Sequence, residues 1–146
     1  MKVLLTGGTG LVGKNILRKY KSGNYEFEIL APKSSELNLL DPNNVSRFIK
    51  AEVPDFVIHA AGKVGGIKAN IKDPVGFLVE NLDMGKNLVL ACKDSRVPNF
   101  LNLGSSCMFP RNAENPLKEE MVLAGELEPT NEGYALAKVM VARLCQ

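Results

Sequence analysis

The chain has 146 residues, of which 45% are hydrophobic and 23% charged, and its formal net charge is +2. This composition is ordinary for a globular protein of one domain, and the nearly balanced charge argues against a nucleic-acid-binding surface. No apolar stretch is long enough to cross a membrane, and Cys92, Cys107 and Cys145 lack zinc or CxxC spacing. We therefore expect a cytoplasmic protein that uses no metal and binds neither nucleic acid nor a membrane.

Short apolar runs alternate with helix-forming patterns along the chain. The predicted strands cover Lys2–Thr6, Glu26–Ala31, Asp55–Ala61 and Asn99–Leu103. The predicted helices cover 11–21, 42–51, 74–95 and 132–146. Asp41-Pro42 and Asp73-Pro74 are helix-start signals, and Thr130 is expected to cap the last helix. Residues 105–129 contain proline, show weak periodicity and are expected to be irregular.

This alternation predicts an α/β fold in which a doubly wound parallel sheet of the Rossmann type is covered on both faces by helices. Cys92 and Cys145 lie in apolar helical patterns and are expected in the core. The last apolar pattern ends without a cap or a polar tail. We therefore expect residues 1–146 to be the N-terminal, NAD(P)-binding domain of a longer protein, with a substrate-binding C-terminal domain outside it.

A glycine-rich turn joins the first predicted strand to the first predicted helix. Glycine allows a tight turn and a close approach of the backbone to a pyrophosphate, and the helix N-terminus offers free N–H groups. A turn without a ligand is the alternative, but the position after the first strand favours dinucleotide binding. The predicted contacts of this turn are Gly7, Gly8, Thr9, Gly10, Leu11, Val12 and Gly13.

The residues after the second predicted strand bear on the choice of cofactor. Enzymes selective for NAD usually carry an acid there, but this strand ends in Leu30-Ala31-Pro32-Lys33-Ser34-Ser35. Lys33 and Ser34 could receive a 2′-phosphate, which favours NADP(H); an ordinary surface lysine at position 33 is the alternative. The remaining residues expected to contact the cofactor are Asn38, Leu39, Ala60, Ala61, Leu103, Gly104, Ser105, Ser106, Tyr134 and Lys138.

Three of these residues also suggest proton-transfer chemistry. Tyr134 and Lys138 are four residues apart, so they share one helix face. A nearby ammonium favours a phenolate, so Lys138 is expected to lower the pKa of Tyr134 from ~10. Ser105 could hydrogen-bond the reacting oxygen. An ordinary helical Tyr/Lys pair is the alternative, but the glycine turn and the strand-end serine in the expected order favour the catalytic interpretation.

Together these motifs resemble the extended, nucleotide-sugar-modifying branch of the short-chain dehydrogenase/reductase family, and within it the GDP-L-fucose synthases. The resemblance covers the whole chain. Beyond the glycine turn it rests on four segments, Glu36–Asp41, Ala60–Ile67, Gly104–Pro110 and Leu127–Glu132. It implies that Ser105, Tyr134 and Lys138 support hydride transfer from NADPH to the C4 ketone of GDP-4-keto-6-deoxy-D-mannose.

The resemblance also implies a role for Cys107 as an acid/base in epimerisation at C3 and C5, although Cys107 could instead be a buried loop thiol. The family's second acid/base is a histidine beyond the end of this chain, and His59 is no substitute for it. Two alternatives remain open. The chain could belong to a nucleotide-sugar epimerase or dehydratase that uses NAD, or it could bind a nucleotide without turning anything over.

Oligomerisation is a further implication of the resemblance. The predicted helices 74–95 and 132–146 resemble the pair that forms a four-helix dimer interface in this family. We therefore expect a homodimer.

Overall fold

Four strands form one parallel sheet in the computed structural model, which describes residues 1–146. They are β1 (Lys2–Thr6), β2 (Glu28–Leu30), β3 (Phe56–His59) and β4 (Asn99–Asn102), and their order in the sheet is β2-β1-β3-β4. Leu4 of β1 pairs with Leu30 on one side and with Val57 on the other. The central strand β1 is apolar because it must bury side chains on both faces.

Five helices accompany the sheet: α1 (Leu11–Ser22), α2 (Pro42–Glu52), α3 (Ile67–Lys72), α4 (Pro74–Asp94) and α5 (Glu132–Leu144). The chain forms two compact units. The first unit contains residues 1–62, 83–103 and Cys145, and the second contains residues 63–82, 104–144 and Gln146. That residues 1–146 act as one cofactor-binding domain stays a prediction.

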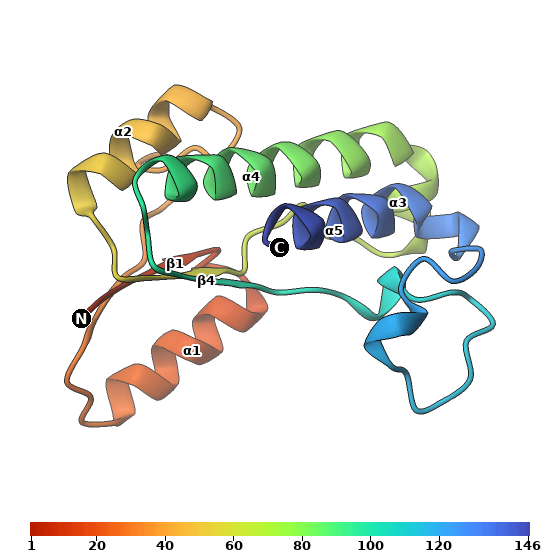
Figure 1. The fold of residues 1–146 in the computed structure, drawn as a ribbon, viewed down its shortest axis with the longest axis horizontal. Coiled ribbons are helices and arrows are strands. Elements are labelled where there is room, and N and C mark those ends of the chain that lie inside the picture. Colours follow the sequence, from red (N-terminus) through yellow and green to blue (C-terminus); the bar gives the residue numbers. More distant parts are fainter. The chain divides into compact units, whose positions relative to one another are not determined.

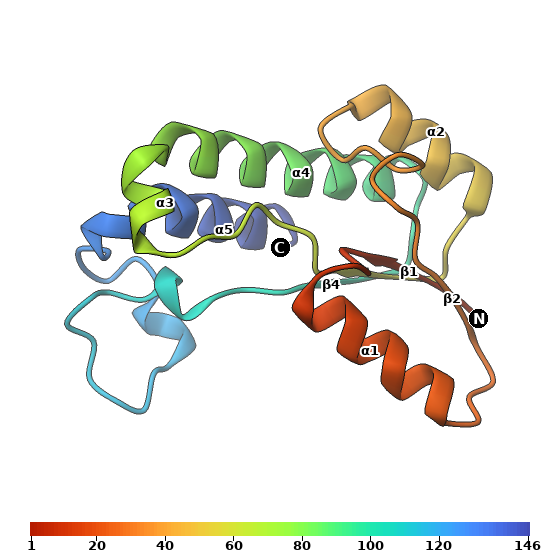
Figure 2. The same ribbon diagram turned by 180° about the vertical axis from the view of Figure 1, so that it is seen from behind.

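The first unit is a three-layer arrangement. Helix α1 covers one face of the sheet, whereas α2 and the part of α4 that belongs to this unit cover the other (Figures 1 and 2). The predicted doubly wound parallel sheet is confirmed. The core between the sheet and the second layer of helices is formed by Leu4, Leu37, Leu39, Val45, Ile49, Val57, Leu88, Ala91 and Cys92.

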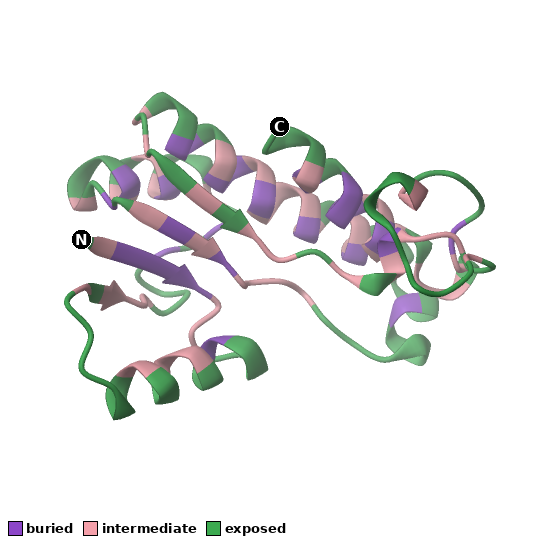
Figure 3. Ribbon diagram, turned by 60° about the horizontal axis from the view of Figure 1, so that its bottom comes forward, coloured by how far each residue is buried: buried purple, intermediate pink, exposed green.

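Burial falls off across the sheet from its centre to β4 (Figure 3). Leu5 of β1 is fully buried, but Leu101 of β4 keeps 46% of its surface exposed. Strand β4 pairs only with β3, so it is an edge strand of this sheet.

The predicted strands are longer than the observed ones at β2 and at β3, where the structure has Phe56–His59 instead of Asp55–Ala61. The structure has a strand over Glu28–Leu30, whereas the sequence predicted one from Glu26 to Ala31. The Tyr20 hydroxyl donates a hydrogen bond of 2.6 Å to the carbonyl oxygen of Phe27, and the rings of Tyr20, Tyr25 and Phe27 pack together. This aromatic cluster holds the residues before β2 outside the ladder.

The start of α2 is confirmed. The Asp41 carboxylate accepts hydrogen bonds from the backbone N–H groups of Asn43 (2.9 Å) and Asn44 (3.2 Å), and Pro42 occupies the first helical turn. An aspartate at this position satisfies N–H groups that have no partner inside the helix.

The second unit contains α3, the first half of α4, and α5 after a long irregular segment. That segment was predicted, and its only regular parts are single 3₁₀ turns over Ser106–Met108, Glu119–Met121 and Pro129–Asn131. Helix α5 contacts the first and last of these turns. The sequence did not predict α3, which is six residues long and starts after Gly66 without a capping side chain.

Two predictions about the C-terminal region are wrong. Thr130 does not cap α5, because its hydroxyl donates to the Glu128 carboxylate at 3.0 Å and the helix begins at Glu132. Cys145 is exposed rather than buried, since α5 ends one residue before it, at Leu144. Cys92 is buried, as expected.

Candidate functional site

The glycine turn lies at the carboxyl end of β1, where the chain connections change direction across the sheet. Strand β1 lies between β2, which is the next strand in sequence, and β3, which comes after β2. In doubly wound sheets, ligands bind in the crevice at such a switch point. Gly7 has φ +73°, and a Cβ built on it would lie 2.6 Å from the backbone nitrogen of Ala61. Only glycine therefore fits between the ends of β1 and β3.

Gly13 serves a different purpose, because it brings α1 against the turn. A Cβ at Gly13 would lie 2.2 Å from the carbonyl oxygen of Gly7 and 2.7 Å from the Cα of Gly8. The Gly10 N–H donates to the Gly7 carbonyl at 2.9 Å and closes the turn. The predicted glycine loop is thus a tight backbone cradle, which a side chain at position 7 or 13 would fill.

The N-terminus of α1 is open to an anionic group. Its N-cap, Gly10, provides no side-chain hydrogen bond, and no acidic residue lies in the first turn. The first-turn N–H groups and the helix dipole both favour a phosphate at this position. These residues therefore fit the pyrophosphate of a dinucleotide. Leu11 and Val12, which open the helix, are exposed.

The tip of β2 carries the basic and hydroxyl residues that the sequence singled out, together with an acid that it did not. Lys33 and Ser34 are both exposed. The Glu36 carboxylate accepts a 2.7 Å hydrogen bond from the backbone N–H of Lys33, so it folds back onto this turn. One carboxylate oxygen of Glu36 is therefore engaged by the backbone of this turn, whereas Lys33 itself is exposed to solvent.

The other predicted cofactor residues of the first unit follow the carboxyl ends of β2, β3 and β4. Asn38 is exposed, whereas the Leu39 side chain belongs to the core, so Leu39 offers only its backbone to a ligand. Ala60 and Ala61 follow β3, and the Ala61 N–H donates to the Thr6 hydroxyl at 3.3 Å. Leu103 follows β4 and donates its N–H to the carbonyl oxygen of His59 at 3.2 Å.

His59 is a buried structural residue, consistent with the expectation that it does not donate protons to a substrate. It is 2% exposed, and its Nδ1 lies 2.9 Å from the Thr6 hydroxyl. The Thr6 hydroxyl therefore links the ends of β1 and β3 through His59 and Ala61.

The four predicted catalytic residues, Ser105, Cys107, Tyr134 and Lys138, all belong to the second unit. Gly104 and Ser106, which flank Ser105, are exposed. Ser105 precedes the turn at Ser106–Met108, and its hydroxyl accepts from the backbone N–H of Cys107 at 3.4 Å. The Ser105 side chain also hydrogen-bonds Tyr134. On α5, the Lys138 Nζ lies 5.8 Å from the centroid of the Tyr134 ring.

The pKa of Tyr134 moves in the direction opposite to the sequence prediction. Burial raises this pKa above the ordinary value of 10.0, and negative charge on Cys107 raises it further, while the hydrogen bond with Ser105 opposes both. Burial lowers the pKa of Lys138 from its ordinary value of 10.5. The expected lowering is wrong because burial of the phenol outweighs the influence that lowers its pKa, the hydrogen bond with Ser105. Tyr134 is therefore a protonated phenol at neutral pH.

Asn131, a residue that the sequence motifs do not single out, contacts Cys107. Its Nδ2 donates to the Cys107 sulfur at 3.2 Å, and its Oδ1 is buried without a hydrogen-bond partner. Asn131 lies in the Leu127–Glu132 segment, but its role depends on contact with a turn 24 residues away. Spacing along the chain could not reveal that contact.

The loop after β3 is also fixed by residues that the sequence did not single out. The Asn81 side chain accepts from the Lys63 N–H at 2.9 Å and donates to the Lys63 carbonyl at 3.0 Å. The Lys63 ammonium lies 2.7 Å from carboxylate oxygens of both Asp73 and Glu80. These bonds hold the start of the Lys63–Gly66 loop against α4 within the second unit.

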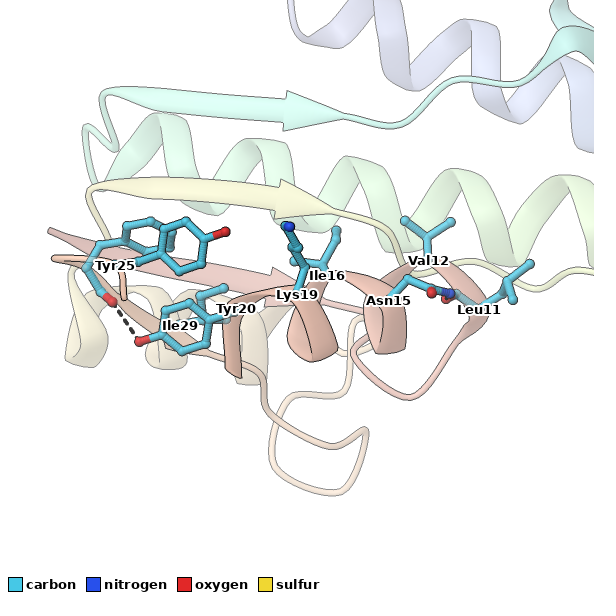
Figure 4. Close-up of a pocket in the computed structure, with 9 residues that line it drawn as sticks. Leu11, Val12, Asn15, Ile16, Lys19, Tyr20, Tyr25 and Ile29 are labelled. Atoms are coloured by element: carbon cyan, nitrogen blue, oxygen red, sulfur yellow. Dashed lines mark hydrogen bonds between the residues drawn. The ribbon is translucent and has the colours of Figure 1, made fainter. Parts of the chain in front are cut away.

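An open apolar groove of about 550 Å³ runs along α1 in the first unit. Figure 4 shows Leu11, Val12 and Ile16 of α1 along this groove, with Tyr20 and Tyr25 at its far end. Of the predicted cofactor residues, only Leu11 and Val12 line it. Its lining is mostly apolar, although Asn15, Lys19 and the two tyrosines also belong to it, and we assign it no role in cofactor binding.

Residues 3–146 match the model of the NAD dependent epimerase/dehydratase family. The chain belongs to this family. The match confirms the family resemblance drawn from the sequence.

The chain is 56% identical over 146 residues to GDP-L-colitose synthase from Yersinia pseudotuberculosis, covering 100% of this chain and 47% of that protein. It is 47% identical over 146 residues to GDP-L-fucose synthase from Azorhizobium caulinodans, covering 99% of this chain and 46% of that protein. The chain therefore spans about half the length of the curated relatives it matches.

Two solved structures share the fold closely. A GDP-D-glycero-L-gluco-heptose synthase from Campylobacter jejuni, solved in the presence of NADPH, matches with a TM-score of 0.91 at 29% identity over 99% of this chain and 42% of that one. A GDP-L-fucose synthetase from Naegleria fowleri bound to NADP matches with a TM-score of 0.85 at 31% identity, over 98% of this chain and 42% of that one.

The raised pKa of Tyr134 can be tested by titration of tyrosine absorbance in the chain and in Tyr134→Phe. The difference between the two curves isolates Tyr134 and should have its midpoint above pH 10.0. Because the folded chain holds this proton more tightly than the unfolded chain, the associated stability is present below pH ~10 and is lost as the pH rises through the folded pKa. A midpoint below 10 would instead show that Lys138 dominates.

Proposed function

We propose that this chain supplies the cofactor-binding and proton-transfer residues of an NADP(H)-dependent epimerase/reductase that acts on a 4-keto GDP-sugar. The observation that carries the proposal is the glycine cradle at the switch point, in a chain that also contains the Ser105, Cys107, Tyr134 and Lys138 group. The relatives of the chain carry GDP-sugar names, which supports the substrate class.

The first unit is proposed to bind the cofactor. Gly7 and Gly13 keep the turn free of side chains, and the first-turn N–H groups of α1 bind the pyrophosphate. When bound, NADPH supplies a hydride to the C4 carbon of the substrate. Lys33 and Ser34 are proposed to receive the 2′-phosphate, and two structural neighbours contain NADP or NADPH.

Calorimetric titration of the chain with NADPH and NADH tests this assignment. We expect binding with NADPH preferred, and we expect Lys33→Ala to reduce that preference by about tenfold because it removes a charge-assisted bond to the phosphate. Lys50→Ala, which removes another exposed lysine, is the matched control and should change nothing. A preference for NADH would favour the NAD-dependent epimerase or dehydratase alternative, and binding of neither would contradict the proposal.

The second unit is proposed to carry the proton chemistry. In reduction of a ketone, the oxygen at C4 gains negative charge as the hydride arrives and must be protonated. Tyr134 is suited to this step because its phenol holds a proton at neutral pH. Ser105, which hydrogen-bonds Tyr134, is proposed to orient the phenol and to donate to the same substrate oxygen. Lys138 is proposed to help return a proton to Tyr134 after each turnover.

Cys107 is proposed to move protons at the carbons beside the ketone. The thiolate removes a proton from such a carbon, the electron pair moves onto the C4 oxygen as an enolate, and reprotonation on the opposite side inverts the centre. Cys107 is half-buried and lies beside Ser105 and Asn131.

The identity of the GDP-sugar leaves two candidates. The first is GDP-4-keto-6-deoxy-D-mannose, giving GDP-L-fucose after epimerisation at C3 and C5. The second is the 4-keto GDP-sugar that leads to GDP-L-colitose, which the 56% identity to a GDP-L-colitose synthase favours.

Turnover of both substrates by the enzyme expressed from the complete reading frame separates these candidates and tests the residue roles. Tyr134→Phe should reduce ketone reduction by about 10²–10⁴-fold while leaving NADPH binding nearly unchanged, because it removes only the proton donor.

Cys107→Ser should slow exchange of substrate protons with solvent deuterium more than it slows reduction of an already epimerised ketone. Equal losses in both steps would contradict the role of Cys107.

We also propose that the protein forms a homodimer through α4 and α5. Within the second unit, each of these helices exposes large apolar side chains, Val75 and Val79 on α4 and Met140 on α5. Light scattering should give the mass of a dimer for the protein from the complete reading frame. Val79→Glu should shift it toward the monomer, since a charge at a packed interface is unfavourable, whereas Leu123→Glu at an exposed loop position should not. A monomeric wild type would contradict the proposal.

The three cysteines are free, so the chain needs no oxidising compartment. No helix of the structure has the length and apolar character needed to cross a membrane. We propose that the protein works in the cytoplasm, where thiols stay reduced.

A further inference from the structure

We propose that Asn131 is a positioning residue for Cys107, and that its side-chain amide holds the sulfur and favours the thiolate over the thiol. This inference rests on the proposed function, in which Cys107 exchanges protons with carbons beside a ketone. It adds a residue to that step which is neither part of the Ser/Tyr/Lys group nor next to Cys107 in sequence.

The contact between the two residues is built into the packing of the second unit. The Nδ2 of Asn131 lies 3.2 Å from the Cys107 sulfur and donates to it. Cys107 is in the turn at Ser106–Met108, and Asn131 is in the turn at Pro129–Asn131. Helix α5 contacts both turns, so the helix that carries Tyr134 also holds Asn131 against Cys107.

The direction of this hydrogen bond determines its chemical effect. An amide N–H can only donate, and a thiolate accepts hydrogen bonds more strongly than a thiol does. The bond therefore stabilises the charged form of Cys107, which is the form that can remove a proton. The backbone N–H of Cys107 is already engaged by the Ser105 hydroxyl at 3.4 Å, which fixes the other side of the residue.

The other end of the amide supports the same conclusion. The Oδ1 of Asn131 is buried and has no hydrogen-bond partner. Buried polar atoms without partners are uncommon in folded proteins, and each calls for an explanation. Asn131 retains an unpaired oxygen while its nitrogen is directed at a sulfur, which is consistent with a residue kept for that sulfur rather than for stability.

The charged and titratable groups around this pair come from two segments. Helix α5 contributes Tyr134, whose proton equilibrium responds to the charge on Cys107, and Lys138, which lies over the Tyr134 ring. The segment before α5 contributes Glu128, whose carboxylate is occupied by the N–H and hydroxyl of Thr130, and the helix itself begins with Glu132.

Alkylation of Cys107 by iodoacetamide measures the thiolate directly and needs neither cofactor nor substrate. The rate is followed by mass spectrometry of the Cys107 peptide in the chain, in Asn131→Ala and in Asn131→Asp. At pH ~7 we expect Asn131→Ala to react about five- to tenfold more slowly and Asn131→Asp more slowly still, because the aspartate places a negative charge beside the sulfur. At pH ~10.5, where an ordinary thiol is ionised, the rates of Asn131→Ala and the unmodified chain should converge.

The control is Asn112→Ala, which makes the same substitution at an exposed position of the same unit and should react like the unmodified chain. Unchanged rates at pH ~7 would overturn the proposal. A slowing by the same factor at both pH values would also overturn it, since it would show a change in access to the sulfur. Should Asn131→Ala melt below the assay temperature, Asn131→Leu, which has nearly the same size as asparagine but cannot donate a hydrogen bond, replaces it, and an unchanged rate at pH ~7 would overturn the proposal. A failed NADPH titration would count against the proposed function without changing this result.

Discussion

The close approach of three backbone segments at the carboxyl end of β1 is the constraint on which the first unit depends. Gly7 fits against Ala61 only because it has no side chain, and Gly13 lets α1 begin against the same turn. A side chain at either position would push apart β1, β3 and α1. The same absence of side chains leaves an open cradle at the uncapped N-terminus of α1, so one steric requirement both builds the fold and gives a shape that fits phosphate groups.

The second unit depends on polar contacts instead of close backbone packing. Ser105 contacts both Cys107 and Tyr134, Asn131 contacts Cys107, and Lys138 lies over the Tyr134 ring. Such a network couples the protonation of its members, because a charge on one changes the energy of a charge on the next. A protonated Tyr134 beside an ionisable Cys107 suits a reaction in which a base acts at carbon and an acid then acts at oxygen.

Particular elements show why some predictions succeeded and others failed. The Asp41-Pro42 start of α2 was predicted because an N-cap and its N–H groups are neighbours in sequence. The predicted cap of α5 was wrong, because the Thr130 hydroxyl donates to Glu128 and the helix begins two residues later. The start of β2 depends on the hydrogen bond from Tyr20 to Phe27, which joins residues seven apart. Helix α3 was not predicted because no capping side chain marks its start in the sequence. Cys145 was expected in the core, but the helix that carried its apolar pattern ended just before it.

The sequence by itself determined the alternation of strands and helices, the parallel doubly wound sheet and the glycine turn, whereas the roles of Ser105, Tyr134 and Lys138 stay a prediction. These features follow from local periodicity and from residue types at fixed spacing. Only the tertiary structure decided the direction of the Tyr134 pKa shift, the core position of Leu39, the return of Glu36 onto the Lys33 turn and the contact between Asn131 and Cys107. Burial and hydrogen bonding depend on distances in space, and the folding of the chain sets those distances between residues that the sequence keeps apart.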